Sequence, residues 1–359
     1  MKRLHWAVVV VLLSLGLAAC GSSSDDDGGG GSGTTARAED LSGRCTGEKV
    51  KFQLSFFPNA QFAGWLVADR QGFFAEEGLD VELVPGGPQT QVELALADGS
   101  VDVGLIDFTA GATARQRGAP ITYVAQVYHR NSVAYVSLKR SGIERPEDLE
   151  GRKLGVQRVS ASIDGLNPLV VLLLQRAGLG TDAVEKVPVG FGIEDLLAGK
   201  ADVIPARVFF HIAQLESAGY DYPDGVNVLN PDDFGIDLVD HGVAVNDDYL
   251  ADNRQAVACL LRAGKKGWEA AVADPDAAVR DVMAFLPKGS SNARDQAIDV
   301  AETLKLIKRD GMSDAELMRL DMDAIDATVD TMKRFRLFDE EFDTGDYVDT
   351  TLWGVLGES

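Results

Sequence analysis

The chain has 359 residues, of which 34 are Lys or Arg and 56 are Asp or Glu, so its formal net charge is −22. This acidic balance argues against nucleic acid as a partner, because no basic cluster is present to neutralise phosphates. With 45% hydrophobic residues, the roughly 310 residues beyond the N-terminal region form an ordinary globular chain that is large enough for two lobes.

The first twenty residues have the pattern of a bacterial lipoprotein signal. Lys2 and Arg3 precede an apolar run at residues 7–17, which is too short to span a hydrocarbon core. The run leads into Leu-Ala-Ala-Cys at residues 17–20, a motif in which the cysteine sulfur receives the lipid. We predict a signal peptide over residues 1–19 and lipidation of Cys20. The protein would then be exported and lipid-anchored to the outside face of the cell membrane, or to its periplasmic face.

Residues 20–47 are predicted to form the lipidated cysteine and a disordered tether. Residues 21–35 contain only Gly, Ser, Asp and Thr, so they have no apolar side chain to bury. A tether of this length has a mean reach of about 25–30 Å. The folded body can therefore contact a partner in the same membrane, while its own membrane contact is through the lipid anchor only.

From residue 48 onward, short β-branched runs alternate with helical patterns. This alternation predicts βαβ units on a parallel sheet. The first part of lobe one, residues 48–132, is predicted to have strands at residues 50–57, 80–84, 101–105 and 121–128 and helices at residues 62–73, 89–97 and 108–117.

The alternation restarts near residue 133, which predicts a second α/β lobe over residues 133–240. Its strands are expected at residues 132–139, 153–157, 185–189, 201–205 and 226–229, and its helices at residues 163–177, 193–197 and 208–218. A strand at residues 238–245 returns the chain to lobe one, and the rest of residues 241–359 is mainly helical and is expected to pack there. The predicted fold class is α/β, with two lobes joined by a two-strand hinge. A single doubly wound domain is the alternative.

Cys45 and Cys259 are the cysteines that remain after lipidation of Cys20. In an oxidising compartment, such a pair is a candidate disulfide. Two buried free thiols are the alternative.

Several short motifs in order resemble one branch of the periplasmic binding proteins. Examples are residues 57–64 (FPNAQFAG), 97–104 (ADGSVDVG) and 151–156 (GRKLGV). The branch includes binders of thiamine pyrimidine precursors, riboflavin, alkanesulfonates, taurine and nitrate. The resemblance runs from about residue 50 to residue 352, so it covers the whole predicted body.

The resemblance implies a type II-like periplasmic-binding-protein fold and a role in transport. The partners would be a small-molecule ligand and the permease and ATPase of an ABC importer. We expect a monomer with no cofactor and no metal site. A sensory or adhesive lipoprotein with the same fold is an alternative that the sequence leaves open.

Candidate ligand contacts are the residues that follow the predicted strands, because ligands in open α/β sheets bind beyond the carboxyl ends of the strands. The aromatic candidates could stack on a planar ring, and the polar ones could bond its edge. Ring packing in the core, helix or turn capping and a surface ion pair are the structural alternatives. The candidates are Phe57, Asn59, Gln61, Phe62, Asp107, Phe108, Gln126 and Tyr128 in lobe one, and Arg158, Ser160, Phe191 and Arg207 in lobe two.

The number of aromatic candidates favours an aromatic heterocycle, either riboflavin or a thiamine-type pyrimidine, over alkanesulfonate, taurine or nitrate. The pyrimidine binders typically have a histidine where Phe62 stands, which weakens that assignment. A thiamine pyrimidine synthase of the same fold is the enzyme alternative. That enzyme requires a lysine after the strand at residues 101–105, where this chain has Ile106, Asp107 and Phe108. We therefore expect a binding protein and not an enzyme.

Overall fold

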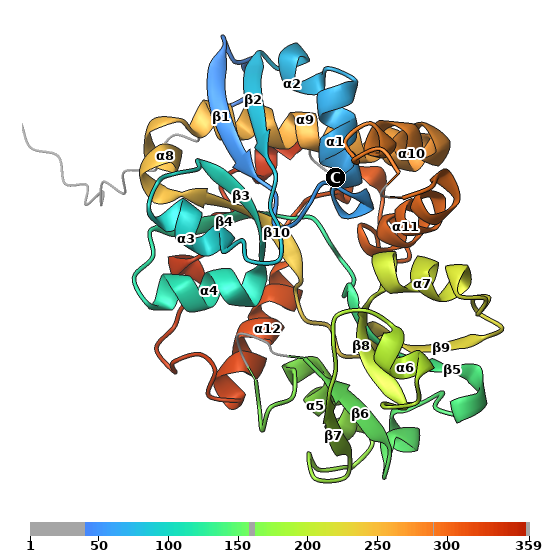
Figure 1. Ribbon diagram of the computed structural model, residues 1–359. Coiled ribbons are helices and arrows are strands. Elements are labelled where there is room, and N and C mark those ends of the chain that lie inside the picture. The colour runs from blue at the N-terminus through green and yellow to red at the C-terminus, as the bar shows by residue number, and fades with distance from the viewer. Residues whose placement is uncertain (1–39, 158–161, 290, 357–359) are drawn as a thin grey trace, which may run out of the picture. The chain divides into compact units, whose positions relative to one another are not determined.

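The computed structural model describes residues 40–157, 162–289 and 291–356. The predicted signal peptide, the lipidation site at Cys20 and most of the predicted tether lie outside these residues. Within the described part, the chain forms two five-stranded sheets, each with its own helices (Figure 1).

The first sheet has the strand order β2-β1-β3-β10-β4. Strands β1, β2 and β3 are parallel to one another, whereas β10 is antiparallel to both of its neighbours. The strands are β1 (Glu48–Gln53), β2 (Leu79–Val84), β3 (Val103–Asp107), β4 (Ile121–Gln126) and β10 (His241–Asn246). The connecting helices are η1 (Ala60–Phe62), α1 (Ala63–Arg70), α2 (Phe73–Glu76), α3 (Val92–Ala97) and α4 (Phe108–Gln116).

The second sheet repeats this topology, with the order β7-β6-β8-β5-β9. Its parallel strands are β6, β7 and β8, and β5 is antiparallel to both of its neighbours. The strands are β5 (Val133–Leu138), β6 (Lys153–Val156), β7 (Glu185–Pro188), β8 (Val203–Arg207) and β9 (Val226–Leu229). The helices are α5 (Pro168–Arg176), α6 (Glu194–Leu197) and α7 (Val208–Ser217).

The chain passes between the sheets twice, after β4 and after β9. In each case the strand that follows the crossing, β5 or β10, inserts antiparallel into the sheet that it enters. The predicted two-lobed α/β fold is therefore confirmed. Val133 and His241 are the first residues of these two strands, and we retain the predicted lobe boundaries at these positions as a proposal.

The helices after β10 serve both lobes. They are α8 (Asp247–Asp252), α9 (Arg254–Ala273), α10 (Pro275–Met283), α11 (Ala293–Leu306) and α12 (Met322–Arg334). As predicted, α9 and α10 pack against α1 of the first lobe, but α11 packs mainly against α7 of the second lobe. Of the helices in the described residues, none combines the length and apolar character that a membrane crossing requires.

The close packing of α9 on α1 depends on glycines opposite tryptophans. A Cβ on Gly64 would lie 2.2 Å from the Trp268 ring, and a Cβ on Gly264 would lie 2.2 Å from the Trp65 ring. Both indoles are fully buried. Because each ring occupies the place of a missing side chain, the two helix backbones approach closely and the C-terminal segment is fixed to the first lobe.

The predicted helix at residues 163–177 is shorter in the structure and begins only at Pro168. Asp164 and Gly165 have φ values of 51° and 79°, which interrupt a right-handed helix. The Asn167 side chain caps the first turn, and Pro168 occupies a position at which no backbone donor is needed. The local turn chemistry therefore overrides the apolar pattern before Pro168.

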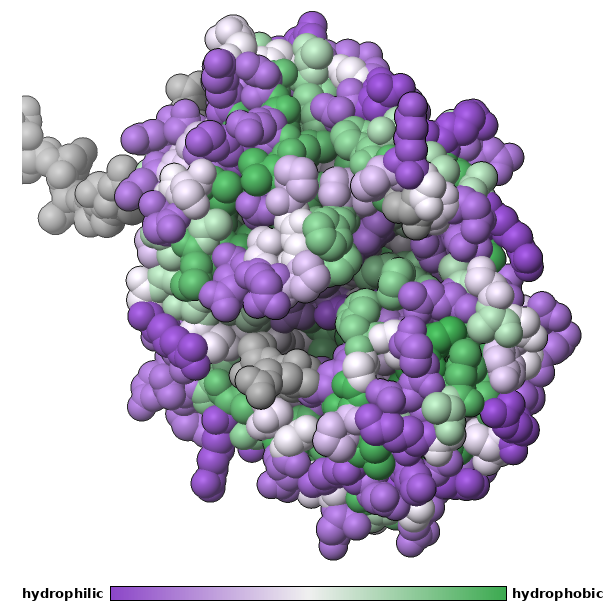
Figure 2. Space-filling view, in the orientation of Figure 1, coloured by the Kyte–Doolittle hydropathy of each residue, from purple (hydrophilic) through white to green (hydrophobic). Residues whose placement is uncertain are grey.

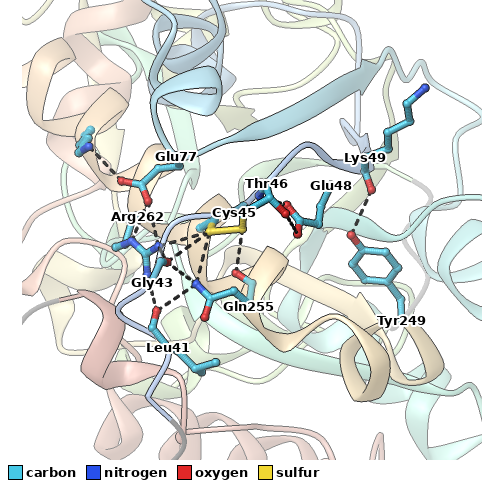
Figure 3. Close-up of a disulfide and its surroundings, with 12 residues drawn as sticks. Leu41, Gly43, Cys45, Thr46, Glu48, Lys49, Glu77, Tyr249, Gln255 and Arg262 are labelled. Atoms are coloured by element: carbon cyan, nitrogen blue, oxygen red, sulfur yellow. Dashed lines mark hydrogen bonds and ion pairs between the residues drawn. A yellow bond between two sulfur atoms is a disulfide. The ribbon is translucent and has the colours of Figure 1, made fainter.

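A disulfide joins Cys45, which precedes β1, to Cys259 in α9, with their Cα atoms 6.4 Å apart (Figure 3). Arg262, one turn later in α9, donates hydrogen bonds of 2.7 Å to the carbonyl oxygens of Leu41 and Gly43. It also pairs with Glu77 at 2.9 Å. The start of the folded body is thus held on α9 by one covalent bond and several polar contacts.

Replacing both cysteines, in a Cys45→Ser/Cys259→Ser variant, should lower the free energy of unfolding by about 2–4 kcal/mol. The disulfide closes a loop of 214 residues, and removing it restores conformational freedom to the unfolded chain. Urea denaturation of the variant and of the wild type with and without reductant measures the effect. Equal stability of all three samples would show that the disulfide contributes nothing.

Candidate functional site

Three adjoining cavities, which we call the cleft, are all lined by Arg207. Two of them have lining residues from both lobes, whereas the third is lined by residues of the second lobe alone. Their volumes are about 280, 280 and 80 Å³. Figure 2 shows hydrophobic residues around the hollow between the two halves of the body, with hydrophilic residues over much of the remaining surface. The cleft is the natural place in this fold for a small molecule.

Asp107 and Arg207 occupy equivalent positions in the two lobes. Asp107 is the last residue of β3 and directly precedes α4, and Arg207 is the last residue of β8 and directly precedes α7. In the antiparallel ladders, Asp107 lies opposite His241 and Arg207 lies opposite Val133. The repeated topology therefore brings a carboxyl group from one lobe and a guanidinium group from the other to the same cleft.

Arg207 is held by groups from both chain crossings. Its Nη1 donates to Ser132 Oγ and lies 3.5 Å from Asp240 Oδ1. Asp240 is only 3% exposed, and it accepts hydrogen bonds from the Ser132 backbone N–H (2.8 Å) and from His241 Nδ1 (2.7 Å). We call these four residues the hinge network, because they join the crossing before β5 to the crossing before β10.

The hinge network keeps Asp240 ionised. Burial alone would raise the pKa of Asp240, but the His241 and Arg207 side chains and the Ser132 hydroxyl outweigh this effect and hold that pKa below its usual range. Because an ionised carboxylate only accepts hydrogen bonds, His241 Nδ1 is the donor in this pair. The other ring nitrogen, His241 Nε2, lies 3.5 Å from Gln61 Nε2 on the wall of the cleft.

Aromatic rings from both lobes meet at the cleft. Phe56, in the loop after β1, has its ring centroid 6.5 Å from that of Phe191, in the loop after β7, and Phe191 lies 5.6 Å from Phe210 of α7. All three rings line the same cavity, and Phe191 is 52% exposed. A planar ligand can contact rings of both lobes here.

The buried side chain of His211 holds two cleft residues, Phe191 and Arg207, in place. Its Nε2 contacts the Phe191 carbonyl oxygen at 2.6 Å, and its Nδ1 lies 3.0 Å from the Arg207 backbone nitrogen. Burial lowers the pKa of His211, so the neutral ring can donate through Nε2 and accept through Nδ1. His211 thus positions Phe191 and Arg207 relative to each other.

Three polar candidates of lobe one lie at the cleft, and two of them also accept hydrogen bonds from backbone N–H groups at the start of a helix. Asn59 Oδ1 accepts from the Gln61 backbone N–H at 2.9 Å, and Asp107 Oδ1 accepts from the Ala110 backbone N–H at 2.9 Å. Gln61 Nε2 also contacts Ser55 Oγ at 3.2 Å. These bonds fix the side chains in place, and Asn59, Gln61 and Asp107 all line the cleft.

Four predicted contacts must be corrected, because Phe62, Phe108, Gln126 and Tyr128 are each at most 1% exposed and line none of the three cavities. Phe108 packs against the Tyr123 ring, Tyr128 donates to the Gln61 carbonyl oxygen, and Gln126 bonds the backbone at Tyr128 and Asp321. These side chains support the cleft from the core.

The remaining candidates are distributed differently. Phe57 is 54% exposed and lies beside Phe56, but it lines a neighbouring cavity. Arg158 and Ser160 lie outside the described residues, so their roles stay a prediction.

The sequence-based prediction missed Phe56, Phe210 and His241. Two of these were detectable, because Phe56 directly precedes a predicted candidate and Phe210 lies in the first turn after β8. Among the described residues, no three potential metal-ligating side chains form a group.

Comparison with known proteins gives one family model, described as NMT1/THI5 like, which matches residues 59–278. The chain is 29% identical over 240 residues to a formylaminopyrimidine-binding protein from Halalkalibacterium halodurans. The aligned region covers 66% of this chain and 70% of that protein. It is 26% identical over 303 residues to the riboflavin-binding protein RibY from Chloroflexus aurantiacus, which covers 80% of each.

The similarity also extends to an enzyme and to solved structures. The chain is 27% identical over 253 residues to a 4-amino-5-hydroxymethyl-2-methylpyrimidine phosphate synthase from Saccharomyces cerevisiae, with 67% of this chain and 72% of the enzyme covered. The periplasmic aliphatic sulphonate binding protein SsuA from Escherichia coli superposes with a TM-score of 0.68, at 15% identity, over 85% of this chain and 92% of that one. At this identity, the structural likeness shows the fold alone.

The hinge network generates a stability prediction. An Asp240→Asn variant should lose about 3–5 kcal/mol of unfolding free energy, because it removes the buried partner of Arg207 and His241. Since the folded pKa of Asp240 is depressed, the difference from wild type should persist down to about pH 4 and shrink only below it. Urea denaturation over this pH range measures it.

Asp233→Asn is the matched control. The Asp233 side chain is 58% exposed and pairs with Arg130 at 2.8 Å, so its replacement should cost less than about 1 kcal/mol. Equal losses in the two variants would contradict a special role for Asp240.

Proposed function

Because the chain belongs to the NMT1/THI5-like family, we propose that it is an extracytoplasmic solute-binding lipoprotein that captures a small molecule for an ABC importer. The observation that carries this proposal is the cleft itself, to which each of two lobes of equal topology contributes aromatic and polar groups. The named binding proteins among the relatives support the same role.

The composition of the cleft favours an aromatic heterocycle as the ligand. Phe56, Phe191 and Phe210 provide ring faces, and Asn59 and Asp107 provide groups for the ring edge. Riboflavin and a thiamine pyrimidine precursor both have this combination of a flat ring and polar edges.

A free oxyanion such as an alkanesulfonate is the second candidate, and the charges of the cleft disfavour it. Among the described lining residues, the carboxyl groups of Glu93, Asp107 and Asp240 face a single guanidinium, that of Arg207. Arg207 is already bonded to Ser132 and paired with Asp240. The described residues of the cleft therefore offer little uncompensated positive charge to an anion.

Binding is coupled to lobe closure in this proposal. Phe56 belongs to the first lobe, whereas Phe191 and Phe210 belong to the second. A ring held between them makes all of its contacts only when the lobes are closed, so the ligand shifts the hinge equilibrium towards the closed form. The permease can then distinguish loaded from unloaded protein by shape.

A synthase activity like that of the yeast relative has little support in the cleft. Such an enzyme requires a lysine near the end of the third strand, where this chain has Ile106, Asp107 and Phe108. No lysine is among the described residues that line the cleft, so no amine there is placed to form a Schiff base. We therefore retain a binding role without catalysis.

Replacing Phe191 with Ala should weaken binding of riboflavin or of an aminopyrimidine by about 1–3 kcal/mol, by analogy with base stacking on aromatic side chains. Calorimetric titration of the purified body measures the affinity. Leu94→Ala is the control, because Leu94 is also exposed, at 57%, and does not line the cleft. The heterocycle assignment is wrong if neither compound binds while taurine or an alkanesulfonate does and Arg207→Ala abolishes that binding.

The anchor has its own test. A Cys20→Ala variant cannot receive the lipid, so the protein should move from the membrane fraction to the soluble extracytoplasmic fraction. Immunoblotting of cell fractions measures the shift. Continued membrane association of this variant would contradict lipidation at Cys20.

A further inference from the structure

The two larger cavities of the cleft differ in the side chains that line them. One, which we call the aromatic cavity, has in its wall the rings of Phe56, Phe191, Phe209 and Phe210. The other, which we call the polar cavity, has no aromatic side chain among the described residues that line it. Its polar lining residues are Asp107, Thr109, Asn131, Asn167, Arg207 and Asp240. The two spaces therefore suit different parts of a ligand.

The aromatic cavity and the polar cavity adjoin, because Asp107, Ala110 and Arg207 line both of them. Each has a volume of about 280 Å³, which is just below the range of about 300–1,000 Å³ that is usual for small-molecule sites. Together they lie within this range. A planar ring in the aromatic cavity therefore leaves the polar cavity to a second part of the same molecule.

Asn131 presents an acceptor to the polar cavity. This residue is 3% exposed, and its Nδ2 donates to the Leu238 carbonyl oxygen at 2.6 Å and contacts Asp232 Oδ1 at 3.5 Å. Both partners are acceptors, which identifies the amide nitrogen and leaves Asn131 Oδ1 as an acceptor. No described residue donates to this oxygen, and it is not among the unpartnered atoms that are closed off from solvent. Because buried polar atoms are nearly always bonded, Asn131 Oδ1 indicates a donor group in this cavity.

Two other side chains present donors to the polar cavity. Arg207 Nη1 is engaged by Ser132 and Asp240, which leaves Nε and Nη2 of the guanidinium as donors. Asn167 Oδ1 accepts from the Leu169 backbone N–H at 2.9 Å, which leaves Asn167 Nδ2 as a donor. Donors and acceptors thus surround one space, and a hydroxyl group matches both because it donates and accepts.

The charge of the polar cavity disfavours an anionic group there. Asp107 and Asp240 line it, and Arg207 is the only basic side chain among its described lining residues. The guanidinium of Arg207 is already paired with Asp240. A phosphate in this space would therefore lie beside two carboxyl groups with little positive charge to offset the repulsion.

We propose that the polar cavity is a subsite for an uncharged, hydroxylated chain that is attached to the ring in the aromatic cavity. The hydroxyl groups would accept from Arg207 and Asn167 and donate to Asn131 Oδ1. This inference rests on the proposed function. Of the heterocycles named there, it selects riboflavin, whose ring carries a chain of several hydroxyl groups, over a simple pyrimidine.

Three flavins test the subsite in the wild-type protein. Lumiflavin has the ring of riboflavin with a methyl group in place of the hydroxylated chain, and riboflavin 5′-phosphate has a charged group at the end of that chain. Calorimetric titration should give an affinity for riboflavin at least about tenfold higher than for lumiflavin, because only riboflavin makes the additional hydrogen bonds. Riboflavin 5′-phosphate should also bind at least about tenfold more weakly than riboflavin, because of its charge.

A Thr109→Leu variant tests the location of the chain. Thr109 lies in the first turn of α4 and lines the polar cavity but not the aromatic cavity. The larger apolar side chain should weaken riboflavin binding at least about fivefold, and it should leave the affinity for lumiflavin within about twofold of wild type. Thr113→Leu is the matched control, because Thr113 lies one turn further along α4 and lines neither cavity. It should leave both affinities within about twofold of wild type.

Several results would overturn the subsite and leave the proposed function in place. They are equal affinities for riboflavin and lumiflavin, an equal effect of Thr109→Leu on both flavins, and binding of an aminopyrimidine when neither flavin binds. Binding of riboflavin 5′-phosphate as tight as that of riboflavin would overturn the uncharged character of the chain. If Thr109→Leu does not fold, the comparison of the three flavins in the wild-type protein decides.

Discussion

The rest of the site depends on the hydrogen bonds and the ion pair that the buried carboxylate of Asp240 makes. It lies directly before β10, where the chain re-enters the first sheet, and it binds Ser132, which directly precedes β5 in the other crossing. A buried charge of this kind is stable only while donors surround it. The same carboxylate therefore joins the two crossings and fixes Arg207 at the point where the three cavities of the cleft meet.

The repeated topology explains why the cleft is chemically asymmetric. The third parallel strand of each sheet ends at the cleft, with Asp107 in one lobe and Arg207 in the other. Each is followed at once by a helix. Asp107 uses one carboxylate oxygen to cap its helix, whereas Arg207 makes no such cap and turns to Ser132 and Asp240. Equivalent backbone positions thus place an acceptor and a donor on the wall of the same cavity.

Much of the fold was predictable from the alternation of apolar patterns, and part of the site from the rule that ligands meet strand ends. The residues that it identified and that line the cleft are Asn59, Gln61, Asp107, Phe191 and Arg207. It also selected Phe62, Phe108, Gln126 and Tyr128, which do not line the cleft. The reason is that a strand end fixes the position of a residue but not the side to which its side chain points. It missed His241 for another reason. Strand β10 is antiparallel to β3, so its first residue, and not its last, lies beside Asp107 at the carboxyl edge, and the strand direction cannot be read from a single sequence.

The net charge of −22 describes neither the cleft nor the neighbouring cavity lined by Phe57, since the local charge balance differs between them. In the cleft, Arg207 is embedded among acceptors, and its charge is balanced within the hinge network before any ligand arrives. In the neighbouring cavity, the described lining residues include Glu194, Asp295 and Asp299 and no basic side chain. The wall of phenylalanines between the two spaces separates these environments. A movement of Phe56 relative to Phe210 would change both spaces at once, because these side chains belong to different lobes and line both the cleft and the neighbouring cavity.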